Sequence, residues 1–490
     1  MGKRSSILSK SSLFSNPINT YLFISLIAGI FAGWYSIIPP AALIILSYFL
    51  LVSLVLSLRF HKVELFPVVL IIFFMSFGAL WVAPYSLHKP SSFLSKDNEF
   101  IIKVTSLPQD KHLKHIFYAR IIRINNYPAS LNVKVNCFHD REIRYRDSYI
   151  VEGKLTRRKL RNSHFYTLWI RNDSFISRLP AGFVDNSIRG FTYKIIAYFK
   201  NNLPCETYKF LSSIFLGRRE LLDKNTKSVF INAAAAHLIA ISGLHVGLLS
   251  AVFFFVLSIF RVKFRMRIII SIAAMALYAL CVGSRPSIVR SFLMFSFMGI
   301  GFLLRRKVSI FDTLSVSGII CLLWNPLWAF DIGFQLSFAA VFAIVLGTVI
   351  FPFAFTHKYK LIAYVKGIFF STLFATTAII PLVAFYFGKF YLIGILSNII
   401  LIPVFALIVV TTFTFICFYF FHFLASILAE VLSFFVFIFI KTATILGSVK
   451  FSSFNIDISL AGVIIYYAIL GIVIVLIYYR SKLIQATTRF

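Results

Sequence analysis

The chain has few acidic residues. Of its 490 residues, 17 are Asp or Glu and 49 are Lys or Arg, so the formal charge at pH 7 is +32. Only 13% of the residues are charged, against roughly 25% in an average soluble domain. This composition excludes an ordinary soluble globular protein. The basic excess reflects a general bias toward lysine or indicates an anionic partner, either lipid headgroups or another polyanion.

Sequence motifs for metal and nucleotide chemistry are missing. None of the five cysteines forms a CxxC or CxxxC pair, so we predict no metal site and no cofactor. There is no GxxxxGK[ST] phosphate loop and no HxHxDH run. We therefore expect no nucleotide hydrolysis and no metal-dependent nuclease in this chain. Cys137 and Cys205 could pair outside the cytoplasm, but their sequence separation leaves this open.

Hydrophobic residues are abundant, at 59% of the chain. Because about 20 apolar residues cross a bilayer, the apolar runs predict a polytopic α-helical membrane protein of about 12 spans. The first run is longer than a signal-peptide core and lacks a small-x-small cleavage site, so it is expected to be an uncleaved span. The predicted spans lie near residues 17–38, 41–58, 66–84, 238–260, 267–283, 287–304, 309–324, 328–353, 361–386, 391–420, 423–447 and 460–479.

Basic clusters between these spans predict the topology. The clusters at 59–62, 261–267, 305–307, 357–360 and 480–482 all fall on the same side of the membrane as the basic N-terminus. By the positive-inside rule both termini are expected in the cytoplasm, and the long segment after the third span is expected outside.

That segment loses its apolar continuity and is predicted to be a basic extracytoplasmic domain. Residues 85–194 hold twenty Lys or Arg and nine Asp or Glu, a net charge of 20 − 9 = +11. Five short β-rich runs suggest a small barrel, and an OB-like barrel fits their number and size. The runs are Phe100–Thr105, Ile116–Ile124, Leu131–Phe138, Tyr149–Leu155 and Phe165–Ile170.

Cations and aromatic residues occur together in this predicted domain, a composition typical of a groove that stacks nucleic-acid bases. A basic rim that faces solvent and lipid is the alternative, and composition alone slightly favours it. The candidate cations are Arg141, Arg144, Arg146, Lys154, Arg157, Arg158, Lys159 and Arg161, and the aromatic residues are Tyr145, Tyr149, Phe165, Tyr166 and Trp169.

The predicted organisation has five parts. In residues 181–236 we expect interfacial amphipathic helices, because Ile188, Phe191, Ile195 and Phe199 recur at helical spacing. The parts are three membrane helices in 1–84, the OB-like domain in 85–180, the amphipathic helices in 181–236, a helical bundle in 237–479 and a cytoplasmic basic tail in 480–490.

The most unusual stretch covers residues 216–250, where charged residues run directly into an apolar span. His237 and His245 bracket Ser242 and Gly243, and polar side chains at membrane depth normally face a cavity or the bundle interior. Gly243 also lies four residues before Gly247, a spacing that lets helices approach closely. Metal binding by the two histidines is disfavoured, because eight residues rotate a helix by about 80° beyond whole turns, although a break at 242–243 could realign them. Buried packing remains the alternative to contact with a ligand.

The motif HLIAISGLHVG at 237–247 resembles the signature of the ComEC competence-protein family. Other stretches resemble the same family in the same order, and together they cover about residues 200–450. They read LGRRELLD, SRPSIVRSFLMFSFMGIGFLLRR, NPLWAFDIGFQLSFAAV and SNIILIPVFALIVV.

This resemblance implies an inner-membrane channel that conducts single-stranded DNA during natural transformation. It implies that the outer domain is OB-like, and that a separate DNA receptor, nuclease and cytoplasmic motor protein act with the channel. Many family members carry a C-terminal domain resembling a metallo-β-lactamase. No such stretch occurs here, so we expect another protein to supply the nuclease. The resemblance points to His237, Ser242, Gly243, His245, Arg285, Arg290, Asp331 and Gln335 as pore candidates.

Two pairs among these candidates have physical roles to weigh. Arg285 and Arg290 lie five residues apart at the start of a predicted span, where they line a pore for phosphates or extend to the membrane interface. Asp331 and Gln335 lie one helical turn apart. A carboxylate repels phosphate, so structural pairing is favoured over a gating role.

Three alternative functions stay open. Buried cations and broken helices also suit a transporter of a small anion or a lipid intermediate. His237 and His245 could instead serve a membrane enzyme as acid and base. The chain could also be a family member that is no longer active in DNA uptake.

Overall fold

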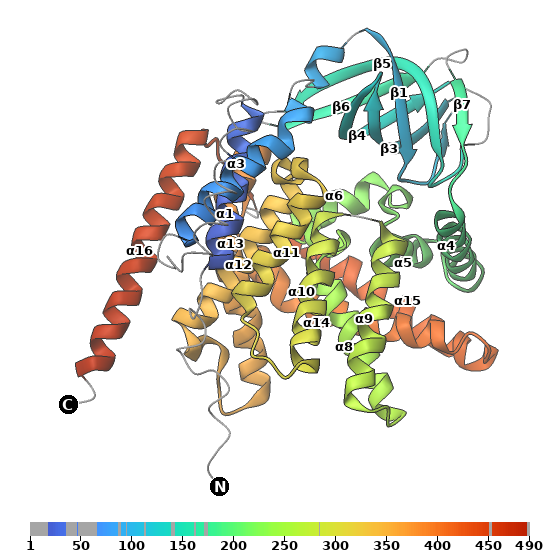
Figure 1. The fold of residues 1–490 in the computed structure, drawn as a ribbon. Helices are drawn as coiled ribbons and strands as arrows, with labels where there is room; N and C mark the ends of the chain where they lie inside the picture. Colours follow the sequence, from blue (N-terminus) through green and yellow to red (C-terminus); the bar gives the residue numbers. More distant parts are fainter. Residues whose placement is uncertain are drawn as a thin grey trace.

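In the computed structural model, a small β-barrel sits at one end of a bundle of helices (Figure 1). The structure describes residues 18–35, 47, 66–86, 90–94, 96–111, 114–138, 143–160, 163–170, 175–283, 285–449 and 453–487. The predicted span at 41–58 falls outside these residues apart from position 47.

The barrel is a closed circuit of five strands. Strand β1 pairs with β3, β3 with β4, β4 with β6, β6 with β5, and β5 returns to β1. The β4–β6 pairing is parallel, and the other four are antiparallel. These strands are β1 (Asp97–Val104), β3 (Lys114–Ile124), β4 (Tyr127–Cys137), β5 (Ser148–Leu160) and β6 (Ser163–Ile170). All five predicted strands are therefore confirmed.

Two further strands extend this circuit and were not predicted. Strand β2 (Gln109–Lys111) pairs with β3, and β7 (Phe175–Leu179) pairs with β5. The inward side chains of the barrel form one apolar core, which includes Phe100, Phe117 and Tyr149. Tyr149 is only 1% exposed. This burial corrects the prediction that Tyr149 belongs to a surface groove.

Two N-terminal helices pack against each other through glycine. Helix α1 (Ile18–Trp34) places Gly29 and Gly33 against the backbone of Met75 and Ala79 in α3 (Phe66–Ser86), and neither position has room for a Cβ atom. The same helix joins the later bundle through a hydrogen bond of 3.0 Å from the amide of Asn19 to Asp312.

The rest of the chain is helical. Helix α4 follows the barrel, and short helices α5 to α7 lead into the bundle. The helices are α4 (Phe183–Asn202), α5 (Cys205–Leu216), α6 (Lys224–Asn232), α7 (Ala236–Ile239), α8 (Gly243–Ile259), α9 (Phe264–Val282), α10 (Pro286–Leu303), α11 (Ile310–Trp324), α12 (Ile332–Ile350), α13 (Lys360–Phe387), α14 (Gly394–Cys417), α15 (His422–Gly447) and α16 (Leu460–Thr487). Short 3-10 helices are η1 (Pro90–Phe93), η2 (Arg219–Leu221), η3 (Pro326–Phe330) and η4 (Pro352–Phe355), and β8 (Lys389–Tyr391) pairs with β9 (Ser453–Asn455).

Eight helices of the described residues are long and apolar enough to cross a membrane. Three further apolar helices, α1, α8 and α11, have only 15 to 17 residues. Two of them are short for a visible reason. The helix is interrupted between α7 and α8, which divides the predicted span at 238–260. Helix α11 ends where Pro326 follows directly after Asn325. The structure thus confirms a polytopic helical membrane protein. Among the described residues, eight of the predicted spans are helices of membrane length and three are shorter apolar helices. The predicted span at 41–58 lies outside the described residues apart from position 47.

Helix α16 lies at the edge of the bundle (Figure 1). It is attached through two neighbouring tyrosines, since the hydroxyl of Tyr466 donates to the carbonyl of Thr377 at 2.9 Å and that of Tyr467 to the carbonyl of Ala378 at 2.7 Å. The carbonyl of Thr377 is free to accept because Pro381, inside α13, has no N–H to donate to this carbonyl four residues earlier.

Candidate functional site

The break between α7 and α8 places His245 at the start of a membrane helix. Ser242 is the residue before α8, and its backbone N–H donates to Nδ1 of His245 at 3.2 Å. Since Nδ1 accepts this bond, the neutral ring carries its proton on Nε2. His245 is 1% exposed, and Nε2 has no hydrogen-bond partner among the described residues. The ring of His245 thus caps α8 through Nδ1, and its buried Nε2–H donor has no partner among the described residues.

His237 lies on α7 and is exposed. The two histidines are close enough for their charges to interact, as a break in the helix would allow. No group of three or more His, Cys, Asp or Glu in the described part of the chain could hold a metal ion. Cys137 is buried and Cys205 is exposed, and the structure contains no disulfide between them.

Gly243 allows α8 to approach α10. A Cβ atom at this position would lie 2.9 Å from Oγ of Ser291 and 3.0 Å from Nη2 of Arg290. Nothing lies within 4 Å of the corresponding position at Gly247. Only the first of the two glycines therefore serves the close approach that their spacing predicts.

Arg290 is buried inside the bundle, and no described carboxylate pairs with it. It is 4% exposed, and Nη2 donates to Oγ of Ser291 at 3.1 Å. Its guanidinium carbon lies 5.6 Å from the ring centroid of Phe338, and Nε has no hydrogen-bond partner among the residues that the structure describes. Because the side chain is only 4% exposed and lies inside the bundle, Arg290 does not fit the alternative of a side chain that extends to the membrane interface.

Arg285 caps the start of α10 and contacts the loop after α5. Its Nη2 donates to the carbonyl of Gly217 at 3.4 Å. Burial lowers the pKa of Arg285 below its ordinary value, Glu220 opposes this effect, and Arg218 adds to it. The side chain therefore lies in a cluster of charges and not at an isolated helix end.

The segment Gly217–Glu220 supplies two more cations that were not among the predicted site residues. Gly217 ends α5 in the left-handed conformation, with a φ of 71°. Arg218 is 1% exposed, and its guanidinium carbon lies 3.8 Å from the ring centroid of Tyr145. Burial, and then Arg285, lower the pKa of Arg219 to about 10, so it stays charged at neutral pH. The available signal was the LGRRELLD stretch itself, which is charged within an apolar chain.

Asp331 and Gln335 make structural contacts. Asp331 caps α12, and its carboxylate accepts from the backbone N–H of Phe334 at 3.0 Å. Gln335 donates to the carbonyl of Ala329 at 2.9 Å and accepts from the hydroxyl of Tyr386 at 2.9 Å. The charge of Asp331 also acts on Arg120 of the barrel and on Arg285.

The predicted cations of the barrel divide into two groups. Arg146 is 9% exposed; it donates to Asp185 at 2.7 Å and to the carbonyls of Leu280 and Cys281 at the end of α9. It therefore joins the barrel to the bundle. Arg144, Arg157 and Arg158 are exposed. Arg141 and Arg161 lie outside the described residues, and for Lys159 only the backbone is described.

The outer face of β5 and β6 combines cations with aromatic rings. Arg158 pairs across the strands with Phe165, and Lys154 pairs with Trp169. Phe165 is 50% and Trp169 40% exposed, and Trp169 stacks with Phe138 at a centroid distance of 6.3 Å. This set, here called the β5–β6 face, retains part of the predicted aromatic groove. Tyr145 is 3% exposed, so its place in that groove was wrong.

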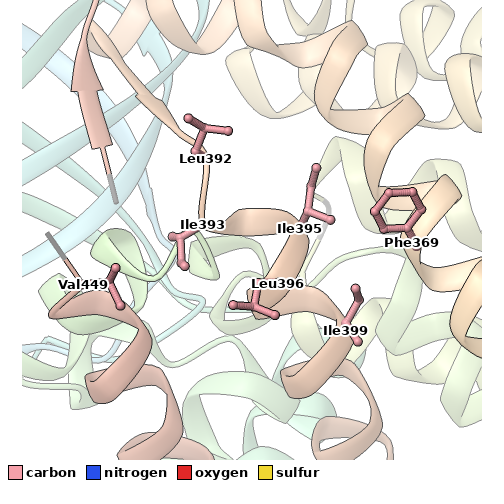
Figure 2. Close-up of a pocket in the computed structure, with 7 residues that line it drawn as sticks. All are labelled: Phe369, Leu392, Ile393, Ile395, Leu396, Ile399 and Val449. Carbon is pink, nitrogen blue, oxygen red and sulfur yellow. The ribbon is translucent and has the colours of Figure 1, made fainter. Parts of the chain in front are cut away.

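An apolar groove of about 380 Å³ lies elsewhere, between α13 and the start of α14 (Figure 2). All the residues that line it are apolar, so it offers no group that holds an anion or transfers a proton. They are Phe369, Leu392, Ile393, Ile395, Leu396, Ile399 and Val449.

The fold and the cluster of charges define an integral membrane protein with a β-barrel at one end of its bundle and buried cations near the junction. Residues 214–480 match the family model described as "Competence protein". This match covers more than half of the chain, which therefore belongs to the competence-protein family, and the resemblance drawn from the motifs is confirmed.

The chain is also similar in sequence to two proteins. The chain is 28% identical over 209 residues to ComE operon protein 3 of Bacillus subtilis (strain 168), a match that covers 43% of this chain and 26% of that protein. It is 27% identical over 215 residues to Recombination protein 2 of Haemophilus influenzae (strain ATCC 51907 / DSM 11121 / KW20 / Rd), which covers 41% and 27%. The chain thus matches about a quarter of the length of each relative. No solved structure matches it.

Proposed function

We propose that this protein conducts single-stranded DNA across the inner membrane during DNA uptake for natural transformation. The observation that carries the proposal is the set of cations at the end of the bundle next to the barrel, which form no ion pair with any described residue. A strand carries one negative charge per nucleotide, and a pore offsets the loss of hydration with cations and hydrogen-bond donors. Membership of the competence-protein family supports the same substrate.

The barrel is the proposed receiver of the strand. Its circuit, with one parallel pairing between its third and fifth members in chain order, is the arrangement expected of an OB-like barrel. The β5–β6 face offers exposed aromatic rings for bases and cations for the backbone. Stacking on aromatic residues beside positive charge is how such folds hold single strands.

Helix directions support an outer location for the barrel. Arg146 binds the last carbonyls of α9, and Asn325, after α11, donates to Ser130 of the barrel at 2.7 Å. The basic turns at 261–267 and 305–307 therefore lie at the opposite ends of these helices. By the positive-inside rule those turns face the cytoplasm, together with both termini.

We further propose that the chain is a passive conduit and not an enzyme. Its sequence contains no phosphate loop and no metal-dependent hydrolase motif. A separate receptor, nuclease and motor would then deliver the strand, degrade its complement and pull the strand inward. The use of Nδ1 of His245 in a helix cap disfavours this histidine as a general base.

DNA uptake tests the function directly. Cells that lack the gene should fail to internalise labelled DNA, and a plasmid copy should restore internalisation. Uptake at the normal level in the deletion strain would reject the channel and favour the anion or lipid transporter. The same uptake assay is applied to the point variant R290Q, which removes a buried charge without adding volume.

A further inference from the structure

Three arginines from two elements meet where the barrel joins the bundle. Arg218 and Arg219 belong to the loop after α5, and Arg285 caps α10. The contact of Arg285 with the carbonyl of Gly217 brings it beside the other two. The charge of Arg285 acts on Arg219, and that of Arg218 acts on Arg285. We call these three side chains the junction arginines.

Their positive charge is only partly balanced by the described residues. In the part of the chain that the structure describes, none of the three takes part in an ion pair. Two acids act on them. Glu220 accepts from the backbone N–H of Leu107 at 2.8 Å, and Asp331, which caps α12, acts on Arg285. Two carboxylates, each already engaged in a hydrogen bond, thus act on three guanidinium groups.

Arg218 is the most constrained of the three. At 1% exposure, one face of its guanidinium is covered by the ring of Tyr145. Nε and Nη2 are buried and have no hydrogen-bond partner in the described part of the chain. A buried charge without a partner is strongly unfavourable, whereas the planar edge of a guanidinium matches two oxygens of a phosphate. The unpaired edge of Arg218 therefore has the chemistry of an oxyanion receptor.

We propose that the junction arginines form a binding site for phosphodiester groups, which a nucleic-acid backbone occupies as it passes from the barrel into the bundle. The inference rests on the proposed function and adds the residues that hold the backbone. Phospholipid headgroups and free phosphate share this chemistry, so the test includes each of them. Stacking on Tyr145 fixes the plane of Arg218, so that the donor edge is ordered before the ligand arrives.

Binding to single-stranded DNA provides the first test. The full chain in nanodiscs of neutral lipid is titrated with a labelled oligonucleotide at several salt concentrations. R218Q and R285Q should each lower the affinity about tenfold. Each should also make the slope of log K against log salt shallower by about 0.7, the contribution of one phosphate contact in a single strand. The control is R265Q, which removes the same charge from an exposed position at the other end of the bundle. Slopes that are equal in R218Q, R285Q and R265Q would overturn the site.

Thermal unfolding identifies the source of the phosphate. The oligonucleotide should raise the Tm of the wild type more than that of R218Q, because a ligand stabilises the state that binds it. Inorganic phosphate and nanodiscs of phosphatidylglycerol should give no difference between these two proteins. If phosphatidylglycerol gives the Arg218-dependent shift and the oligonucleotide does not, the site binds lipid and the inference is wrong.

The Tm of the ligand-free protein distinguishes a purely structural role of Arg218 from phosphate binding. If the arginine mainly supports the loop, R218M should lower the Tm of the ligand-free protein and leave the salt slope unchanged. If Arg218 binds a phosphate, R218M should keep or raise that Tm, since an unpaired buried charge is removed. R218M should then also make the salt slope shallower by about 0.7. R218K, which keeps the charge but loses the planar edge, should not restore the affinity. Normal uptake by R218Q in cells, combined with no uptake in the deletion strain, would reject this site and leave the proposed function intact.

Discussion

The side-chain amide of Asn325 donates a hydrogen bond of 2.7 Å to Oγ of Ser130, which joins the end of α11 to strand β4. The same residue caps η3, because its side-chain oxygen accepts from the backbone N–H of Leu327 at 3.0 Å. Asn325 is thus the residue at which α11 ends. Its side chain also caps η3 and binds the barrel.

N325A should therefore destabilise the protein more than the loss of the barrel contact alone. We expect N325A to lower the free energy of unfolding by about 1 to 2 kcal/mol, since it removes both a cap and an interdomain hydrogen bond. S130A, which removes only the second, should cost about 1 kcal/mol or less. Denaturation of the purified protein in detergent measures both. Equal losses would show that the cap contributes nothing.

Asp147 is the most buried carboxylate at the junction, at 0% exposure. It accepts from Arg178 at 2.6 Å, from Arg189 at 2.7 Å and from the backbone N–H of Ala181 at 3.2 Å. D147N leaves two guanidinium groups without their anion and should cost about 3 to 5 kcal/mol of stability. The matched change D97N breaks an exposed pair with Lys154 at 3.6 Å and should cost no more than about 1 kcal/mol. If the two variants unfold at the same denaturant concentration, Asp147 does not hold the junction.

Asp185 gives the junction a defined dependence on pH. Burial acts to raise the pKa of Asp185, but hydrogen bonds from Lys103 and Arg146 outweigh it, so the pKa lies below its ordinary value. A depressed pKa adds stability that is fully present above the pKa of the unfolded chain, about 3.9, and is lost as the pH falls through the lower folded value. The difference in stability between the wild type and D185N should stay constant from pH 7 to about pH 5 and shrink below about pH 4. A difference that instead changes between pH 5 and 7 would assign the effect to another group.

The sequence allows the barrel strands to be predicted because their inward and outward side chains alternate. Strand β2 has three residues, too few for alternation to be recognised. Strand β7 reads FISRL, in which two apolar residues are adjacent, so its apolar and polar residues do not alternate. Membrane helices are predictable from apolar length, but the break before α8 depends on the cap that His245 makes with Ser242. A hydropathy window averages over such a break.

The site was less predictable than the fold because its decisive partners are distant in sequence. Arg146 lies in a basic, aromatic stretch that is typical of a surface DNA contact. In the structure it donates instead to Asp185 and to the carbonyl of Cys281 at the end of α9. Arg218 is buried because Tyr145, on another domain, covers it. No local pattern distinguishes these arginines from exposed ones such as Arg158.

Gly243 and Gly247 provide a matched pair at the start of α8. G243A introduces a Cβ atom 2.9 Å from Oγ of Ser291 and 3.0 Å from Nη2 of Arg290, so α8 and α10 must separate or Arg290 must move. We expect uptake of labelled DNA to fall at least about tenfold, because such a displacement acts on a buried cation. G247A meets nothing within 4 Å and should leave uptake unchanged, while it stabilises the helix by about 0.5 to 1 kcal/mol. Equal uptake in the two variants would show that the approach of α8 to α10 is not required.

The β5–β6 face should bind bases through Trp169 and the backbone through Arg158. W169A should weaken binding of a single-stranded oligonucleotide to the purified chain by about 1 to 3 kcal/mol, the contribution of one stacked base. That loss should persist at high salt, because stacking is not screened, whereas the loss caused by R158Q should fade as salt rises. The control is Y118A, which removes an aromatic side chain that is 53% exposed on β3, away from this face. If Y118A weakens binding as much as W169A, single-stranded DNA has no preferred side on the barrel. A path of the DNA from the β5–β6 face to the junction arginines would then be rejected.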